Sequence, residues 1–276
     1  MLRKLYYLFS PSQRLMVRRL AFLPYDIWDS LTGKRNNNIP PRGMIFTGAG
    51  DFINAGKLFL EFFRQYGELK PHHRVLDVGS GIGRMALPLT TFLSEEGSYE
   101  GFDIVNTGVK WCQKNISTHH PNFNFKLIAL KNDLYSSEGD EAAELKFPYN
   151  NEEFDFVFLT SVFTHMVPSE TKNYMKEISR VLKPSGKCLA TFFVFDYQLP
   201  STPIKPSFGF PVDHGYYKLM DPRVKSANVA FKYDYIEKEL AHDNKLRIKK
   251  FVPGYWQGLE KNKDIDFQDI LVFEKV

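Results

Sequence analysis

The sequence contains little cysteine, no long apolar run and no strong excess of charge of either sign. Cys112 and Cys188 are its only cysteines in 276 residues, and they lack the spacing of metal ligands, so we expect reduced thiols, as in a cytoplasmic protein. No apolar run approaches the ~18 residues of a membrane-spanning helix. The apolar run near the N-terminus stops at Ser10, too early for a signal peptide. We therefore expect an unsecreted chain with a cytoplasmic location.

Two further absences limit the classes of function. The adjacent histidine pairs at 72–73 and 119–120 have no acid or cysteine at the spacing of a metal motif, so no metal is expected. The net charge of +4 is too small to indicate a nucleic-acid partner. A hydrophobic content of 43% with 25% charged residues is ordinary for a globular protein.

The N-terminal residues differ from the rest, so we divide the chain into a basic amphipathic extension, 1–45, and a domain, 46–276. Seven basic residues and two acids within 1–35 give +5, more than the net charge of the whole chain. A helix-start pattern at Ser10 predicts a helix that ends before Pro24. Two interpretations stay open. The helix is either a lid over a pocket or a peripheral contact with the inner face of a membrane.

From residue 46 onward, strand-like and helical patterns alternate. The strands are predicted at 74–78, 98–104, 124–129, 154–160, 188–195, 246–252 and 267–275. Helices are predicted from 52 to about 67 and at 83–93, 106–118, 169–182 and 231–242. Such alternation indicates an α/β fold with a mostly parallel sheet and helices on both faces. The last two strands have no helix between them, so the final strand should run antiparallel.

A glycine-rich turn, "VLDVGSGIGR", follows the first of these strands. Gly79, Gly81 and Gly83 are spaced G-x-G-x-G, which differs from the G-x-G-x-x-G of a dinucleotide site. Asp77, just before the glycines, is poorly placed for a pyrophosphate and well placed for an ammonium group. Asp103 ends the next strand, where an acid grips ribose hydroxyls in βαβ nucleotide sites. The pattern predicts a site for a ribose and a positive charge.

These motifs resemble the class I S-adenosylmethionine-dependent methyltransferases, of the small-molecule type found in bacteria. The resemblance lies in "VLDVGSGIGR", "GFDI" and "FDFVFLTSVFTHM…ISRVLKPSGKCLATF", and "FQDILVFEK" matches the family's reversed seventh strand. It covers roughly residues 46–196 and 227–276. It implies a Rossmann-like seven-stranded sheet and S-adenosyl-L-methionine as the cofactor, and it leaves the substrate open.

The resemblance also assigns residues to parts of the cofactor. The methionine portion would lie against Asp77, Gly79, Ser80, Gly81 and Gly83. The ribose hydroxyls would bind Asp103, and the adenine would lie against Ile104 and one of Asn132 and Asp133. Thr160 and Ser161 follow the fourth strand, where the methionine end of the cofactor would meet the substrate.

His165, just beyond the fourth strand, is the candidate catalytic base. A hydroxyl nucleophile benefits from such a base, but a histidine that only orients the following helix is the alternative. His214 and Asp196 are weaker candidates. The segment 197–226 lies where the superfamily inserts substrate-specific elements, so we expect a substrate-side insertion that forms either the acceptor pocket or a packed surface loop.

We therefore expect methyl transfer to a small-molecule, glycan or lipid-linked acceptor, directed to oxygen. The fourth strand ends in "LTSV" and lacks the "NPPY" or "DPPY" of familiar amino-group and nucleobase enzymes. Two alternatives remain: a nicotinamide-dependent oxidoreductase, and a non-catalytic partner protein that binds S-adenosylmethionine. The sequence does not fix the oligomeric state.

Overall fold

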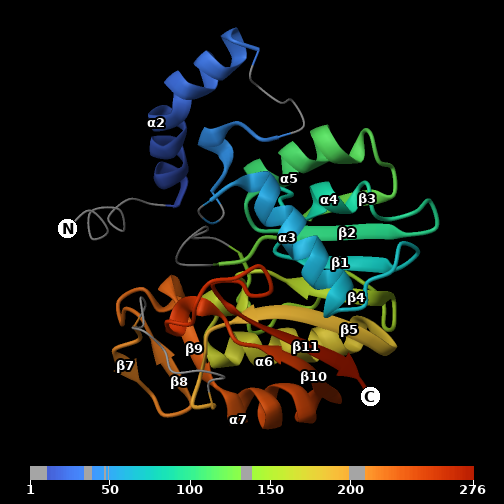
Figure 1. Cartoon of the computed structure of the whole chain (residues 1–276), viewed down its shortest axis with the longest axis vertical. Helices are drawn as coiled ribbons and strands as arrows, with labels where there is room; N and C mark the ends of the chain where they lie inside the picture. Colours follow the sequence, from blue (N-terminus) through green and yellow to red (C-terminus); the bar gives the residue numbers. More distant parts are fainter. Residues whose placement is uncertain (1–10, 34–38, 47, 49, 132–138, 199–208) are drawn as a thin grey trace.

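The computed structural model describes residues 11–33, 39–46, 48, 50–131, 139–198 and 209–276, with side chains from residue 13 onward. A seven-stranded sheet in the order β10-β11-β5-β4-β1-β2-β3 forms its centre (Figure 1). The strands are β1 Arg74–Val78, β2 Ser98–Asp103, β3 Phe123–Leu127, β4 Phe154–Leu159, β5 Leu182–Phe192, β10 Leu246–Val252 and β11 Asp269–Lys275. β11 is antiparallel to β5 and to β10, and the other pairs are parallel. The predicted fold class is confirmed.

Helices cover both faces of this sheet. Side chains alternate along β4, so Phe156 and Phe158 pack on one face while Val157 and Leu159 pack on the other. The first face carries α3 Phe52–Gln65, α4 Ala86–Leu89 and α5 Asn106–Cys112, which a π-helical turn, η2 Gln113–Ser117, continues. The second face carries α6 Pro168–Val181, the short α7 Tyr233–Tyr235 and the turn η5 Ile236–Ala241.

Two predicted helices are wrong in extent. The helix expected at 83–93 covers only Ala86–Leu89, because Gly83 has a left-handed φ of 78° and Pro88 removes a backbone donor. The helix expected at 231–242 begins two residues late, because residues up to Lys232 belong to a strand.

That strand lies in a second, four-stranded sheet that the sequence patterns did not predict. Its order is β6-β9-β8-β7, with β6 Val194–Phe195, β7 Val212–Asp213, β8 Tyr217–Leu219 and β9 Val229–Lys232. Each of its strands has four residues or fewer, too few to show a clear alternating pattern. The described part of the expected insertion, 197–226, contributes β7 and β8 to this small sheet, whereas β6 and β9 lie outside the insertion.

The N-terminal helix α2 is longer than expected and spans Pro11–Leu31, with Pro24 inside it. Pro24 is exposed, so the backbone carbonyl that it leaves without a donor can bond to water. Contacts with the turn η1, Arg42–Met44, hold the second half of α2 in place. Asp26 accepts hydrogen bonds from the backbone N–H of Arg42 at 2.7 Å and of Gly43 at 3.1 Å. α2 stands away from the two helix layers, beside η1 (Figure 1).

Candidate active site

A cavity of about 550 Å³ lies at the carboxyl ends of β1, β2 and β4, the edge where open α/β sheets bind ligands. It brings together nine residues that the sequence singled out: Asp77, Gly79, Ser80, Gly81, Asp103, Ile104, Thr160, Ser161 and His165.

The other three predicted residues are placed differently. Gly83 packs against α5, where a Cβ would meet Cys112 Sγ at 2.9 Å. Asn132 and Asp133 lie outside the described residues, although the preceding Leu130 and Lys131 line the cavity.

The backbone N–H groups of the glycine turn are bonded to the end of β2. The N–H groups of Gly79 and Ser80 both donate to the carbonyl of Phe102 at 2.9 Å, and the N–H of Gly81 donates to Asp103 Oδ2 at 2.8 Å. A Cβ on Gly79 would approach Val162 to 2.6 Å, so a side chain there would clash with the loop after β4. Because these N–H groups are already bonded, the turn is poorly suited to cradling a phosphate.

Asp77 presents a buried carboxylate to this cavity. Its Oδ2 accepts a hydrogen bond of 2.6 Å from the hydroxyl of Tyr99, while its Oδ1 is buried without a hydrogen-bond partner among the described residues. Burial raises the pKa of Asp77 to about 8, and the neighbouring Asp103 adds to the rise, whereas the Tyr99 hydrogen bond opposes it. An unpartnered carboxylate oxygen on a cavity wall is suited to a cationic ligand.

Asp103 connects the turn to the end of β2. Its Oδ2 accepts from Gly81 and its Oδ1 accepts from the N–H of Val105 at 2.7 Å. Burial raises the pKa of Asp103, and these backbone hydrogen bonds oppose the rise. An ionised carboxylate has about four acceptor positions, so two remain for hydroxyl groups of a ligand.

His165 ends the short turn η3, Phe163–His165, between β4 and α6. Its Nδ1 lies 2.7 Å from the carbonyl oxygen of Ser226. A carbonyl only accepts, so Nδ1 carries the hydrogen, and the neutral ring is left with an unprotonated Nε2. Burial lowers the pKa of His165, and the hydrogen bonds to the backbone of Ser226 and Ala227 oppose this effect without cancelling it, so the neutral form is favoured. The geometry fits both sequence interpretations, because His165 lines the cavity and also fixes a loop.

Several cavity residues were missed by sequence reasoning. Tyr255, Asp266, Phe267 and Gln268 come from the connection between β10 and β11 and form one wall. The hydroxyl of Ser161 donates to Gln268 Oε1 at 3.0 Å, which ties this wall to the end of β4. Burial raises the pKa of Asp266. Phe267 and Gln268 were predicted only as the start of the last strand, which begins at Asp269, and no pattern placed this segment beside the glycine turn.

Arg84, which directly follows the glycine turn, was not among the predicted site residues. Its guanidinium lines the cavity, and its Nη2 lies 3.4 Å from the carbonyl of Gly48. Burial lowers the pKa of Arg84, although the group stays charged at neutral pH. The cavity thus holds a cation close to its acidic groups.

The weaker catalytic candidates lie outside the cavity. His214 stacks on Tyr217 with ring centroids 4.5 Å apart, and Asp196 forms an ion pair of 2.9 Å with Lys232. None of the described residues within 197–226 lines the cavity. Within the described part of this segment, the carbonyl of Ser226 bonds to His165 and positions it.

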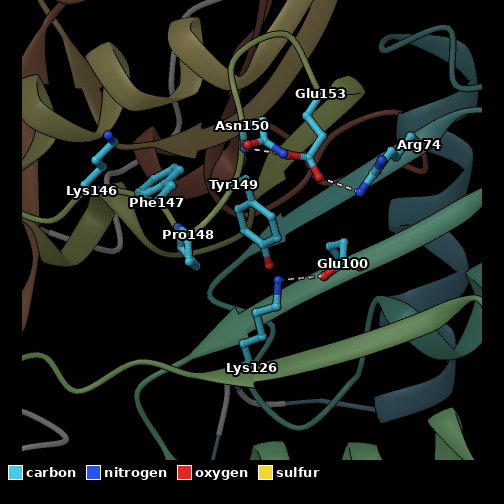
Figure 2. A pocket seen from close by; sticks show the side chains of 9 residues that line it. All are labelled: Arg74, Glu100, Lys126, Lys146, Phe147, Pro148, Tyr149, Asn150 and Glu153. Atoms are coloured by element: carbon cyan, nitrogen blue, oxygen red, sulfur yellow. Dashed lines mark hydrogen bonds and ion pairs between the residues drawn. The ribbon is translucent and has the colours of Figure 1, made fainter.

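A second hollow, of about 490 Å³, lies on the sheet face between β1, β2, β3 and the loop at 146–153 (Figure 2). Two ion pairs line it, Arg74 with Glu153 at 2.5 Å and Lys126 with Glu100 at 3.3 Å. It contains none of the residues that the sequence singled out. Among the described residues, no group of three histidine, cysteine or acidic side chains could hold a metal ion.

Comparison with known proteins agrees with this geometry. Residues 76–190 match the family described as "Methyltransferase domain". The chain is 25% identical to the tRNA N(3)-cytidine methyltransferase METTL2 of Gallus gallus over 46% of the chain and 32% of that protein. It is 27% identical to the ubiquinone/menaquinone biosynthesis C-methyltransferase UbiE of Wigglesworthia glossinidia brevipalpis over 45% of the chain and 44% of that protein. The matches therefore span less than half of either relative.

The fold is also that of solved methyltransferases. An S-adenosylmethionine-dependent methyltransferase from Methanosarcina mazei superposes with a TM-score of 0.50 at 20% identity, over 77% of this chain and 96% of that one. The family match places a methyltransferase domain at residues 76–190, and the sheet order is that of solved S-adenosylmethionine-dependent methyltransferases.

Proposed function

We propose that the chain transfers a methyl group from S-adenosylmethionine to a hydroxyl group of a small-molecule, glycan or lipid-linked acceptor. The observation that carries this proposal is the hydrogen bond from His165 Nδ1 to the carbonyl of Ser226. It fixes one tautomer and leaves Nε2 as a proton acceptor in a side chain that lines the cofactor cavity. A hydroxyl acceptor must lose a proton, whereas an activated carbon acceptor has less need of a base.

The cavity fits the cofactor. The unpartnered Oδ1 of Asp77 would bind the ammonium group, and Asp103 would accept hydrogen bonds from the ribose hydroxyls. Ser80 Oγ, which is also buried without a partner among the described residues, and the Arg84 guanidinium would bind the carboxylate of the methionine portion. When bound, the cofactor supplies a methyl group already activated on a sulfonium. The protein then aligns the acceptor, and alignment can contribute about 7–11 kcal/mol in favourable cases.

The acceptor would lie against the wall formed by Tyr255, Phe267 and Gln268. Two aromatic rings favour an acceptor with an apolar or aromatic part. Asp266 and Glu170 also line the cavity, and their carboxylates disfavour a phosphodiester backbone. For this reason we favour a non-nucleic-acid acceptor, although one relative is named as a tRNA methyltransferase.

The test uses the full-length chain, S-adenosylmethionine and a panel of phenols, hydroxy acids, quinols and glycans, with matched amines. Mass spectrometry would detect the methylated acceptor, and S-adenosylhomocysteine would be quantified in parallel. We expect methylation of one hydroxyl class, reduced about 10²–10⁴-fold in His165→Asn, with cofactor affinity nearly unchanged. His214→Asn is the matched control and should keep full activity.

Four outcomes would contradict the proposal. Equal rates for His165→Asn and wild type would leave the histidine with an orienting role only. Methylation confined to amines would remove the oxygen assignment. Calorimetric binding of S-adenosylmethionine without turnover of any acceptor would favour the non-catalytic partner, and binding of NAD in its place would favour the oxidoreductase.

A further inference from the structure

Helix α2 exposes a wide apolar surface. At about 100° per residue, seven large apolar side chains fall within a sector of about 140°, and they are 48 to 80% exposed. No charged residue of α2 falls in that sector. We call this surface the α2 apolar face; it consists of Met16, Val17, Leu20, Leu23, Ile27, Trp28 and Leu31.

The opposite side of α2 is the one attached to the protein. Asp26 binds the η1 backbone, and Asp29 accepts from the Arg42 guanidinium at 2.9 Å. A Cβ on Gly43 would lie 3.1 Å from the Cα of Arg19, so η1 approaches this side of the helix closely. The apolar face therefore points away from the attached side. A contiguous apolar face of this kind marks an interaction site.

Charge identifies the kind of partner. Residues 1–35 carry +5, and the rest of the chain together carries −1. Arg19 borders the apolar face on the helical projection. Two copies of α2 packed face to face would bring two such positive segments together, whereas an anionic surface would neutralise them. No helix of the described residues is long and apolar enough to cross a membrane.

We propose that α2 lies in the plane of an anionic lipid surface, with the α2 apolar face at the boundary of the headgroups and acyl chains. Arg19 beside this face would contact a lipid phosphate, and Trp28 would lie at the level of the headgroups. The contact does not depend on methyl transfer. It would also bring the cofactor cavity near the bilayer, because Phe46, two residues after η1, lines that cavity.

Tryptophan fluorescence offers a direct test. Trp28 is 64% exposed, while Trp111 and Trp256 are 8% and 5% exposed, so a change on vesicle addition reports on α2. The full-length chain would be mixed with vesicles of phosphatidylcholine alone, or of phosphatidylcholine with phosphatidylglycerol. We expect a blue shift and co-flotation with the anionic vesicles, both weakened by high salt. Trp28→Phe should lose the shift and still float.

Variants test whether the α2 apolar face is responsible for vesicle binding. The double variant Leu20→Glu/Ile27→Glu should bind anionic vesicles at least about tenfold more weakly, because each change places a charge at the apolar boundary. Leu127→Glu on β3, at a site 49% exposed, is the matched control and should bind like wild type. Calorimetry should show unchanged affinity for S-adenosylmethionine in both, so a failed membrane contact is distinguishable from a failed cofactor site.

Two results would overturn the proposal. One is equal flotation of the double variant and wild type. The other is a wild type that does not bind vesicles but forms a dimer in sedimentation equilibrium, together with a double variant that stays monomeric. The second result would assign the α2 apolar face to a second copy of the chain.

Discussion

The hydroxyl of Tyr99 donates a hydrogen bond of 2.6 Å to the carboxylate of Asp77, and both side chains are buried. The two residues lie on adjacent parallel strands, where Asp77 pairs in register with Gly101. A Cβ on Gly101 would come within 2.9 Å of the Tyr99 hydroxyl, so the glycine makes room for this contact. The hydrogen bond keeps the carboxylate easier to ionise than its burial alone would allow.

Replacing Tyr99 with Phe should weaken S-adenosylmethionine binding about tenfold at pH 7. The loss of the donor raises the pKa of Asp77 above about 8, and each unit of pKa costs a factor of about ten in forming the carboxylate. The ring should keep its stacking on Phe123, at 5.0 Å between centroids. Calorimetry at pH 7 and at pH 9 is the measurement. A deficit of the same size at both values would show that the hydroxyl acts by another route.

The wild type should bind S-adenosylmethionine more tightly as the pH rises towards about 8, and then reach a plateau. Below that value the Asp77 carboxyl of the free site is largely protonated. A bound ammonium group favours the carboxylate, so binding releases a proton and affinity grows with pH. Titrations in buffers of different ionisation enthalpy would count that proton.

Asp77→Asn supplies the control for this pH dependence. It should bind at least about tenfold more weakly, since a charge-assisted hydrogen bond is lost, and it should release no proton in this range. A wild-type affinity that does not change between pH 6 and pH 8 would remove Asp77 from ammonium binding.

Asp103→Asn should weaken cofactor binding by about an order of magnitude or more. Asp103 also holds the glycine turn through Gly81 and Val105, so a loss of affinity alone would not prove contact with the ribose. The informative measurement is a double cycle with S-adenosylhomocysteine and an analogue lacking the ribose hydroxyls. If Asp103 contacts the ribose directly, removing the hydroxyls should cost the variant less binding free energy than it costs the wild type. Fully additive losses would assign Asp103 to the turn only.

The sequence predicted the regular parts of this structure well. Both bounds of β1 and β10 were correct, because each is a short run rich in apolar residues with loop residues on either side, a pattern that depends little on distant contacts. The end of α2 was misplaced, because the bonds from Asp26 to η1 support a helix beyond Pro24, and only the folded chain brings those groups together.

The difference between local patterns and long-range contacts also decides how much of the site could be predicted. Asp77, Asp103 and the glycines lie close together in sequence and share one recognisable arrangement. The wall around Asp266 and Gln268 reaches the cavity only because β11 runs antiparallel beside β5, and the tautomer of His165 depends on a carbonyl 61 residues away. Contacts of that range have no local pattern, so this wall of the cavity could not be predicted.

Asp269 should be the most costly carboxylate to alter for stability. It is completely buried and accepts hydrogen bonds from the N–H groups of Val194 and Gly254 and from the indole of Trp256, each at 2.7 Å, and from Tyr197 at 3.3 Å. All four partners donate hydrogen bonds. In Asp269→Asn the side-chain NH₂ group would face these donors and could not accept from them. We expect a loss of about 2–4 kcal/mol in the free energy of unfolding.

Urea unfolding at pH 8, above the pKa of about 7 that burial gives Asp269, would measure this loss with the carboxylate ionised. Asp196→Asn is the matched control, because its ion pair with Lys232 is at the surface and should contribute at most about 1 kcal/mol. Hydrogen bonds from Gly254 and Trp256 attach this segment to Asp269, and Tyr255 between them lines the cavity. Asp269→Asn should therefore also impair acceptor turnover more than cofactor binding. Equal stability of the two variants would show that the buried carboxylate is not what holds this wall in place.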